Sequence, residues 1–232
     1  MGRVIVILVM AEEKWQEADF LRKEIEARDY KALLLDVGLL GKSQGACDIT
    51  REEIIAVSGH SPEKVSLVTD RGKRMPIMVD GAKEKVRQLY SSGQLGGIIS
   101  IGGTTGTQMG TRIMMSLPFG VPKFAVSSTA SLPGFASRYI GTADIVLMHS
   151  VVEIAGLNNL MRNVLSRAAG AICGMVEGST KAPISLMKKD EKICDAIDRF
   201  CQYKSLLFKN KVLDACEDIL ITQIKDEQEE TL

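Results

Sequence analysis

The sequence predicts an α/β protein with a Rossmann-like, doubly wound, mainly parallel sheet. Short apolar runs alternate along the chain with amphipathic segments that have helical spacing. The apolar runs are nearly continuous rather than alternating, which is typical of strands that helices cover on both faces. Polar turns follow several of these runs, and ligands of such folds bind beyond the carboxyl ends of the strands.

The first predicted strand is Val4–Val9, which is too short to span a membrane and lacks the features of a signal peptide. A helix follows it, because Ala18, Leu21 and Ile25 recur at helical spacing with charged residues between them. The next apolar run, residues 32–35, predicts a second strand that ends at Asp36.

Helices are predicted between the second and third strands. Thr50 and Glu53 have the spacing of a capping box, and Ser61-Pro62 has the pattern of an N-cap followed by proline at the first helical position. A longer helix, which Gly93 ends, is predicted from an apolar face made of Val79, Ala82, Val86, Leu89 and Tyr90.

The remaining predicted strands are Ile98–Ile101, Phe124–Val126 and Ile145–Met148. A glycine-rich turn follows the first of these and leads into a helix through Met109 and Ile113. These runs complete a set of at least five predicted strands.

We divide the chain near residue 180. Residues 1–180 are predicted to form a Rossmann-like nucleotide-binding domain, and residues 181–232 a helical C-terminal extension that packs on this domain or on a partner. The extension carries two apolar stripes at helical spacing, Ile193, Ile197, Phe200 and Cys201 followed by Val212, Leu213, Cys216, Ile219 and Leu220.

The composition limits the class of partner. The 232 residues include 29 Lys plus Arg and 29 Asp plus Glu, and this balance argues against nucleic acid and membrane as partners. Five cysteines without a C-x-x-C pair indicate free thiols in a reducing compartment, so we expect a cytoplasmic protein. Neither histidine stands at metal-ligand spacing, so we expect no zinc and assign no metal-binding residue.

Two turns at strand ends are rich in hydrogen-bond donors. A strand-to-helix turn offers backbone N–H groups and the positive end of the helix dipole, glycine lets the backbone approach a phosphate, and hydroxyls add donors. The first turn consists of Gly102, Gly103, Thr104, Thr105, Gly106 and Thr107, and the second of Ser127, Ser128, Thr129, Ala130 and Ser131. We predict that a small anionic ligand binds between them. A ligand-free connection and a solvated helix cap are the alternatives.

Asp36 and Gly38 are further candidates, because they follow the second strand. The segment from Asp36 to Ser43 imitates a P-loop, but the carboxylate at its first position would repel phosphates. The dinucleotide fingerprint also fails, since Gly102 and Gly103 are adjacent and no acidic residue ends the strand that follows them. The sequence therefore disfavours NAD.

Arg71 is the one cationic candidate. Asp70-Arg71-Gly72 follows the apolar stretch Val65–Val68 and is open to two interpretations. Neighbouring charges in such a loop ordinarily form a salt bridge. We adopt the hypothesis that Arg71 faces the ligand, because a guanidinium makes bidentate bonds to an anionic group.

Ordered blocks between Asp36 and Met175 match the pattern of a known family. The blocks are Thr69–Gly72, Gly102–Thr107, Leu117–Lys123, Val126–Ser131, Tyr139–Gly141, Asp144–Ile145 and Ser150–Asn158. In these residues the chain resembles the ATP-binding domain family of the tomato mosaic virus resistance protein and its uncharacterised microbial relatives. The resemblance implies a Rossmann-like fold and the binding of ATP, with which magnesium is compatible as a cofactor.

The chain departs from that family in two places. Relatives have a Gly-Thr-x-Asp-Thr-Lys turn after the first strand, of which only Lys14 is kept here, and Glu12 and Glu13 would repel an anion. Relatives also continue into another Rossmann-like domain from near Ala182, where this chain has its charged extension.

These observations predict a nucleotide-binding subunit, with ATP as the nucleotide, that works with a partner. The partner is a second copy of the chain or a companion chain that supplies the missing second domain. The alternative is a self-sufficient enzyme that acts on a small phosphorylated or carboxylated metabolite. Since no acid–base pair or nucleophile stands out, the catalytic residues stay unassigned. An interaction module with a vestigial site is the third hypothesis.

Overall fold

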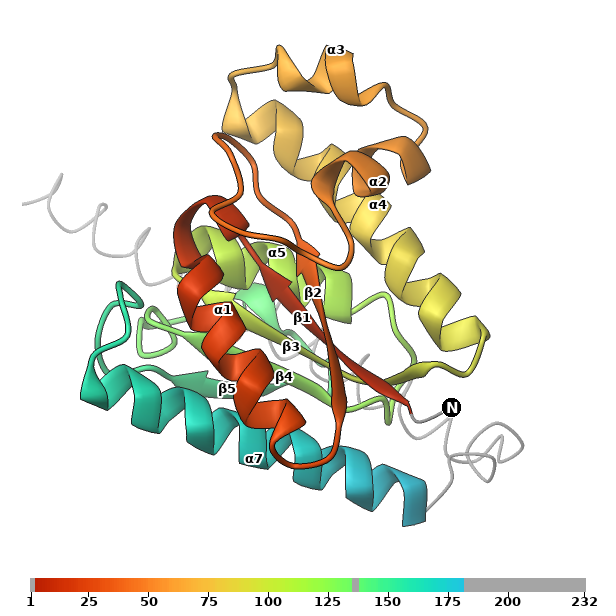
Figure 1. The fold of residues 1–232 in the computed structure, drawn as a ribbon. Coiled ribbons are helices and arrows are strands. Elements are labelled where there is room, and N and C mark those ends of the chain that lie inside the picture. Colours follow the sequence, from red (N-terminus) through yellow and green to blue (C-terminus); the bar gives the residue numbers. More distant parts are fainter. Residues whose placement is uncertain (1–2, 135–137, 182–232) are drawn as a thin grey trace, which may run out of the picture. The chain divides into compact units, whose positions relative to one another are not determined.

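The computed structural model describes residues 3–134 and 138–181 (Figure 1). They belong to the first of two units into which the chain divides, Met1–Ala182 and Pro183–Leu232. The predicted extension, beyond its first residue, therefore lies outside the described residues, and so do its apolar stripes.

A parallel sheet forms the centre of the described unit, which confirms the predicted fold class. Its strands lie in the order β2-β1-β3-β4-β5, and every neighbouring pair is parallel. The strands are β1 (Val4–Val9), β2 (Lys31–Asp36), β3 (Leu95–Gly102), β4 (Lys123–Ser127) and β5 (Val146–His149). Because Gly102 pairs with Ser127 in register, the turns after β3 and β4 start side by side.

Helices cover both faces of the sheet, as Figure 1 shows. The helices α1 (Ala11–Glu26) and α7 (Asn159–Lys181) share a core with Ile5, Ile7 and Val9 of β1. On the other face, α4 (Arg71–Ser91) and α5 (Thr104–Met114) share a core with Val4, Val6 and Leu8. Successive side chains of β1 thus enter opposite cores, which explains its continuous apolar run.

The short helices α2 (Arg51–Val57) and α3 (Pro62–Ser66) begin where the sequence predicts. Thr50 and Glu53 form a reciprocal capping box, and Ser61 accepts a hydrogen bond from the backbone of Lys64. Asp70 caps α4 by accepting from the N–H groups of Gly72 and Lys73. Local side-chain chemistry therefore sets these helix starts.

The third strand starts earlier than predicted, at Leu95 rather than Ile98. The extra residues at this end are Leu95, Gly96 and Gly97, which precede the predicted apolar run. A Cβ at Gly97 would lie 2.9 Å from the side chain of Val176 in α7, so glycine is needed for the close approach of helix and strand.

The strand order creates a topological switch point between β1 and β3. The chain leaves β1 into α1 on one face and leaves β3 into α5 on the other face. Because β1 and β3 are neighbours, their turns part in opposite directions and leave a crevice at the carboxyl edge of the sheet.

Candidate functional site

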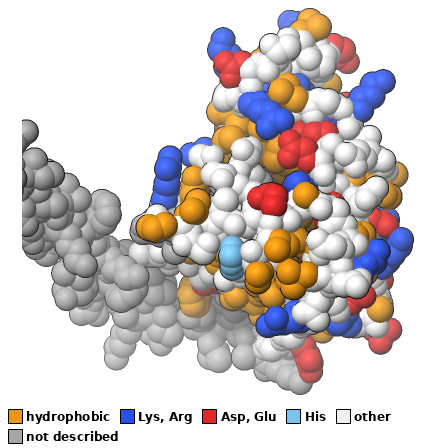
Figure 2. Space-filling view, turned by 90° about the vertical axis from the view of Figure 1, so that its left-hand side faces the viewer, with side chains coloured by type: hydrophobic (Ala, Val, Ile, Leu, Met, Phe, Trp, Pro, Cys, Tyr) orange, Lys and Arg blue, Asp and Glu red, His pale blue; other side chains and the backbone are white. Residues whose placement is uncertain are grey.

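A cavity of about 280 Å³ lies at this switch point, and we call it the switch-point cavity. Its walls come from the turn after β1, the start of α4, the glycine turn after β3 and the segment before α7. The lining residues are Met10, Glu13, Lys14, Arg71, Ile101, Gly102, Gly103, Thr104, Thr105, Gly106 and Glu153. Figure 2 views the side at which the strands end and shows acidic and basic side chains next to one another there.

Residues 102–106 of the predicted glycine turn form one wall of the cavity, and Thr107 is not in its lining. Gly103 is the N-cap of α5 and offers no side-chain cap, so the first N–H groups of the helix have no intrahelical acceptor. A Cβ at Gly102 would lie 2.9 Å from the Cα of Gly106, so this pair lets α5 begin directly against β3. The wall is therefore built of backbone N–H donors and the positive end of a helix dipole.

The second predicted turn does not line the cavity. The hydroxyl of Thr107 lies 2.8 Å from that of Ser127, which also accepts a 3.2 Å hydrogen bond from the N–H of Thr129, and both hydroxyl residues are buried. Ser128 and Ser131 make contacts with Glu153 and His149, at 2.8 and 3.4 Å. The hydroxyls of this turn thus connect the end of β4 to α5, to the end of β5 and to the segment before α7. Ala130 is likewise absent from the cavity lining.

Arg71 lines the cavity and also forms an ion pair. Its Nη2 lies 3.1 Å from Oε1 of Glu13, and both side chains are well exposed. Its ion pair is with Glu13 rather than with the neighbouring Asp70, and contact with an anionic ligand stays a prediction. A partly exposed pair of this kind opens at little cost, so Arg71 is available to an anion.

The carboxylates of the altered first turn are largely compensated. Glu12 accepts hydrogen bonds from the backbone of Leu39 and Leu40, at 2.7 and 3.2 Å, and lies 3.2 Å from Nη2 of Arg51. Glu13 has Arg71 as its partner. The repulsion of an anion expected from these two residues is therefore weakened by their own cations and donors.

Lys14 brings a cation into the cavity. Its backbone is not helical (φ −129°, ψ 23°), so α1 is kinked at this residue. Within residues 3–134 and 138–181, the ammonium group of Lys14 has neither an ion pair nor a hydrogen-bond acceptor. Among the described residues it therefore has no partner that competes with a ligand at the cavity.

Asp36 and Gly38 lie outside the cavity and hold the loop after β2. Asp36 accepts hydrogen bonds from the N–H groups of Ala11 and Gly38, at 3.2 and 2.8 Å, and from the guanidinium of Arg51, at 3.0 and 3.1 Å. A Cβ at Gly38 would overlap the side chains of Glu12 and Arg51. Their role in the fold is therefore to complete a buried ion-pair network.

A second buried arginine lies near this network but has no partner in it. The side chain of Arg74 is 6 % exposed, and its Nε has no hydrogen-bond acceptor within the described part of the chain. Burial, together with the positive charge of Arg51, lowers the pKa of the Arg74 guanidinium, although Glu12 acts in the opposite direction. The cost of burying this charge is only partly offset.

Sequence reasoning did not assign five of the cavity residues to a site, namely Met10, Glu13, Lys14, Ile101 and Glu153. Glu153 lies 25 residues beyond Ser128, to which it is hydrogen-bonded, so no local spacing points to it. Two features of the sequence could have pointed to these residues. Lys14 is kept from the turn that relatives have after the first strand, and Glu153 lies in the block Ser150–Asn158 that matches the family.

Among the described residues, no group of three or more His, Cys, Asp and Glu side chains could hold a metal ion. The carboxylates that line the cavity are Glu13 and Glu153. No helix in residues 3–134 and 138–181 is long and apolar enough to cross a membrane.

Comparison with known proteins places the chain in a family. Residues 3–181 match the N-terminal domain of the uncharacterised protein family UPF0261. A UPF0261 protein of Clostridium tetani is 37 % identical over 183 residues, which are 79 % of this chain and 44 % of the relative. A UPF0261 protein of Mesorhizobium japonicum is 35 % identical over 182 residues, or 77 % of this chain and 44 % of that protein.

A plant protein shares the same region. The ToMV resistance protein Tm-1(GCR237) of Solanum lycopersicum is 33 % identical over 150 residues, which are 62 % of this chain and 20 % of the plant protein. The chain thus spans less than half the length of each of these relatives. With the match over residues 3–181, the chain belongs to the uncharacterised protein family UPF0261, whose N-terminal domain it contains.

Proposed function

We propose that the switch-point cavity binds a nucleotide, with ATP as the nucleotide, through its phosphate groups. The observation that carries the proposal is the placement of the cavity between the turns after β1 and β3, where the open end of α5 meets Lys14 and Arg71. Backbone N–H groups, a helix dipole and two cations form a phosphate site together. The resemblance of the glycine turn to an ATP-binding domain supports the same ligand.

Magnesium fits this proposal through oxygen ligands. Glu13 and Glu153 bring carboxylates to the cavity that also holds the glycine turn. Magnesium is bound in proteins by one or two carboxylates together with phosphates and water. Either carboxylate would then contact the cation that a nucleotide carries.

We further propose that another domain or chain completes the site. The cavity of about 280 Å³ is below the range of roughly 300–1,000 Å³ that is usual for small-molecule sites. It holds phosphates more readily than a whole nucleotide, so a further wall would cover the base and sugar. A companion chain or a second copy of this chain would provide that wall.

The free thiols of Cys47 and Cys173 support a reducing, cytoplasmic compartment.

Calorimetric titration with MgATP tests the ligand. The Thr105→Glu variant places a carboxylate at the open end of α5 and should weaken binding at least tenfold, and Lys14→Ala should weaken it severalfold. Lys73→Ala is the matched control, since Lys73 is an exposed cation on the same helix as Arg71 but not in the cavity lining. Unchanged affinity in Thr105→Glu would move the site elsewhere.

Substitution of Gly106 is a poor test of binding, because a Cβ there would lie 3.4 Å from the carbonyl oxygen of Ile101 and larger side chains would disturb the contact of α5 with β3. The proposal of a partner is tested separately, by light scattering with and without MgATP. A chain that stays monomeric and binds MgATP tightly by itself would exclude the need for a further wall.

A further inference from the structure

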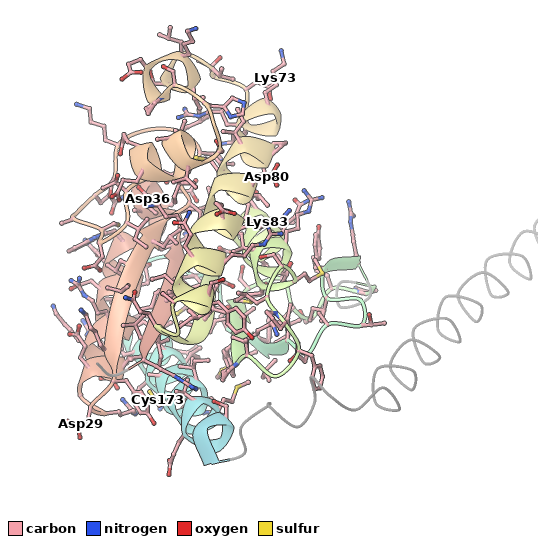
Figure 3. The ribbon with its side chains drawn as sticks, turned by 90° about the vertical axis from the view of Figure 1, so that its right-hand side faces the viewer. Asp29, Asp36, Lys73, Asp80, Lys83 and Cys173 are labelled. Atoms are coloured by element: carbon pink, nitrogen blue, oxygen red, sulfur yellow. The ribbon has the colours of Figure 1, made fainter. Side chains whose placement is uncertain are left out.

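A second hollow, of about 480 Å³, lies between α4 and α5, and we call it the α4–α5 groove. It is lined by Pro76, Val79, Asp80, Lys83 and Arg87 of α4 and by Arg112, Met115 and Ser116 from the last turn and end of α5. Figure 3 shows Asp80 and Lys83 on the side of α4 that faces α5. The groove shares no residue with the switch-point cavity.

The groove is cationic in a chain whose charges otherwise balance. It has Lys83, Arg87 and Arg112 against one carboxylate, that of Asp80. Lys83 lies 3.1 Å from Asp80, but Asp80 is largely exposed, and Arg87 is 4.0 Å from Glu84 in an exposed pair. Such exposed pairs contribute little, so these cations are available to another anion.

Arg112 is the strongest recognition group of the groove. It is exposed and, within the part of the chain that the structure describes, its guanidinium has no ion pair and no hydrogen-bond acceptor. A guanidinium presents a rigid fork of donors that matches a carboxylate better than a lysine ammonium does. An unpaired fork at the rim of a groove therefore favours a carboxylate as its partner.

The floor of the groove is apolar. Val79 is buried, while Pro76 is exposed and Met115 is 45 % exposed, which is high for a large apolar side chain. Methionine is flexible and adapts to varied apolar partners. A small phosphate would use only the cations and would leave this floor uncovered.

The groove is long enough for a peptide. Pro76, Asp80, Lys83 and Arg87 recur at three- and four-residue spacing, so they form one stripe along α4. From Pro76 to Arg87 this stripe is about 16 Å long at a rise of about 1.5 Å per residue. An extended segment of about five residues, or a helix of three turns, spans that length.

We propose that the α4–α5 groove binds an acidic peptide segment of another protein. Carboxylates of the segment pair with Arg112, Arg87 and Lys83, and an apolar side chain of the segment packs on Val79 and Met115. This site shares no lining residue with the switch-point cavity, so its test does not depend on nucleotide binding.

Fluorescence anisotropy tests the proposal on the full chain. The probe is a labelled seven-residue peptide of five glutamates and two leucines, and its control has glutamine in place of glutamate. We expect binding of the acidic peptide that weakens as salt rises, and little binding of the glutamine peptide. Arg112→Glu should weaken binding about tenfold and Met115→Ala severalfold. Lys31→Glu, the same charge change at an exposed residue at the start of β2, should leave it unchanged.

Several results would overturn the proposal. Equal binding of the glutamine peptide, or equal loss in Lys31→Glu and Arg112→Glu, would show that the groove does not select an acidic segment. Full displacement of the peptide by inorganic pyrophosphate at equal concentration would indicate a small-anion site. Tighter binding of a labelled single-stranded oligonucleotide that the Arg112→Glu variant abolishes would indicate a nucleic acid instead of a peptide.

Discussion

Two buried arginines, Arg51 and Arg74, lie close enough for their charges to repel, yet their surroundings differ. Arg51 contacts Asp36 and Glu12 at 3.0 and 3.2 Å, whereas Arg74 has no ion-pair partner within the described residues. The first guanidinium compensates buried carboxylates, and the second is a buried charge without direct compensation. A substitution that removes the charge should therefore act in opposite directions at the two positions.

We expect Arg74→Met to raise the free energy of unfolding by about 1 kcal/mol, because methionine keeps the apolar stem and removes the buried charge. Arg51→Met should lower it by about 3–5 kcal/mol, since Asp36 and Glu12 would stay buried without their cation. Urea unfolding of the two variants and the native protein measures both effects. A loss of stability in Arg74→Met as large as that in Arg51→Met would contradict this interpretation.

The reactivity of the Cys47 thiol tests the electrostatic surroundings of Asp36 and Arg51. Burial and then the negative charge of Asp36 raise its pKa to about 11 from 9.0. The fold stabilises the protonated thiol, and this contribution is lost as pH rises above 9 towards 11. At pH 8.5 Cys47 should contain roughly a hundredfold less thiolate than free cysteine and should react correspondingly slowly with iodoacetamide.

Mass spectrometry of the peptide that contains Cys47 follows this reaction, with N-acetylcysteine as the reference. The rate for Cys47 should continue to rise up to pH 11, after that of the reference has levelled off. A rate at pH 8.5 equal to that of the reference would contradict the raised pKa of Cys47.

At the scale of residues, the sequence predicted what depends on near neighbours in the chain. The glycine turn was found because strand, glycines and helix follow one another directly. The role of Asp36 in the buried ion-pair network was not predicted, because Glu12 and Arg51 lie far from it in sequence and come close to it only in the fold. Whether any of these residues binds a ligand stays a prediction.

Among the elements, glycine has opposite effects at two helical positions. A Cβ at Gly81 of α4 would overlap the carbonyl oxygen of Ile54 in α2, so the two helices touch through this glycine. Gly174 of α7 is exposed, and a Cβ there would meet no atom within 4 Å. The first glycine is needed for packing, while the second only lowers helix propensity.

We therefore expect Gly81→Ala to destabilise the protein by about 1–3 kcal/mol through overpacking. Gly174→Ala should stabilise it by about 0.5–1 kcal/mol through helix propensity. Thermal unfolding compares the two variants, each of which adds a single methyl group. A rise in melting temperature for both would show that α2 and α4 can separate without cost.

The starts of α2, α3 and α4 are encoded locally in Thr50, Ser61 and Asp70, and the sequence pattern predicted the first two. The start of β3 was predicted three residues too late. The close neighbours of Gly96 and Gly97 lie far from them in sequence, in the segment that begins β1, before β4 and in α7, so no local pattern marks these glycines as part of a strand. The order of the strands was not predicted, because parallel pairing depends on crossovers and not on local pattern.

For the molecule as a whole, strand order decides where a ligand site can form. Apolar runs and helical spacing predicted the class of fold correctly. The switch point between β1 and β3 required the order β2-β1-β3-β4-β5, which appears only in the structure. It explains why the turn after β1, and not the hydroxyls after β4, faces the glycine turn across the switch-point cavity.

Helix α1, which follows β1, contains the single tryptophan of the chain. Trp15 follows Lys14 directly, donates a 3.0 Å hydrogen bond from Nε1 to the carbonyl oxygen of Ala46, and occupies the space that a side chain at Gly45 would need. The indole therefore connects the wall of the switch-point cavity to the loop after β2. Its intrinsic fluorescence is a built-in reporter, which can follow the opening of that loop or the arrival of a ligand at Lys14 without any added label.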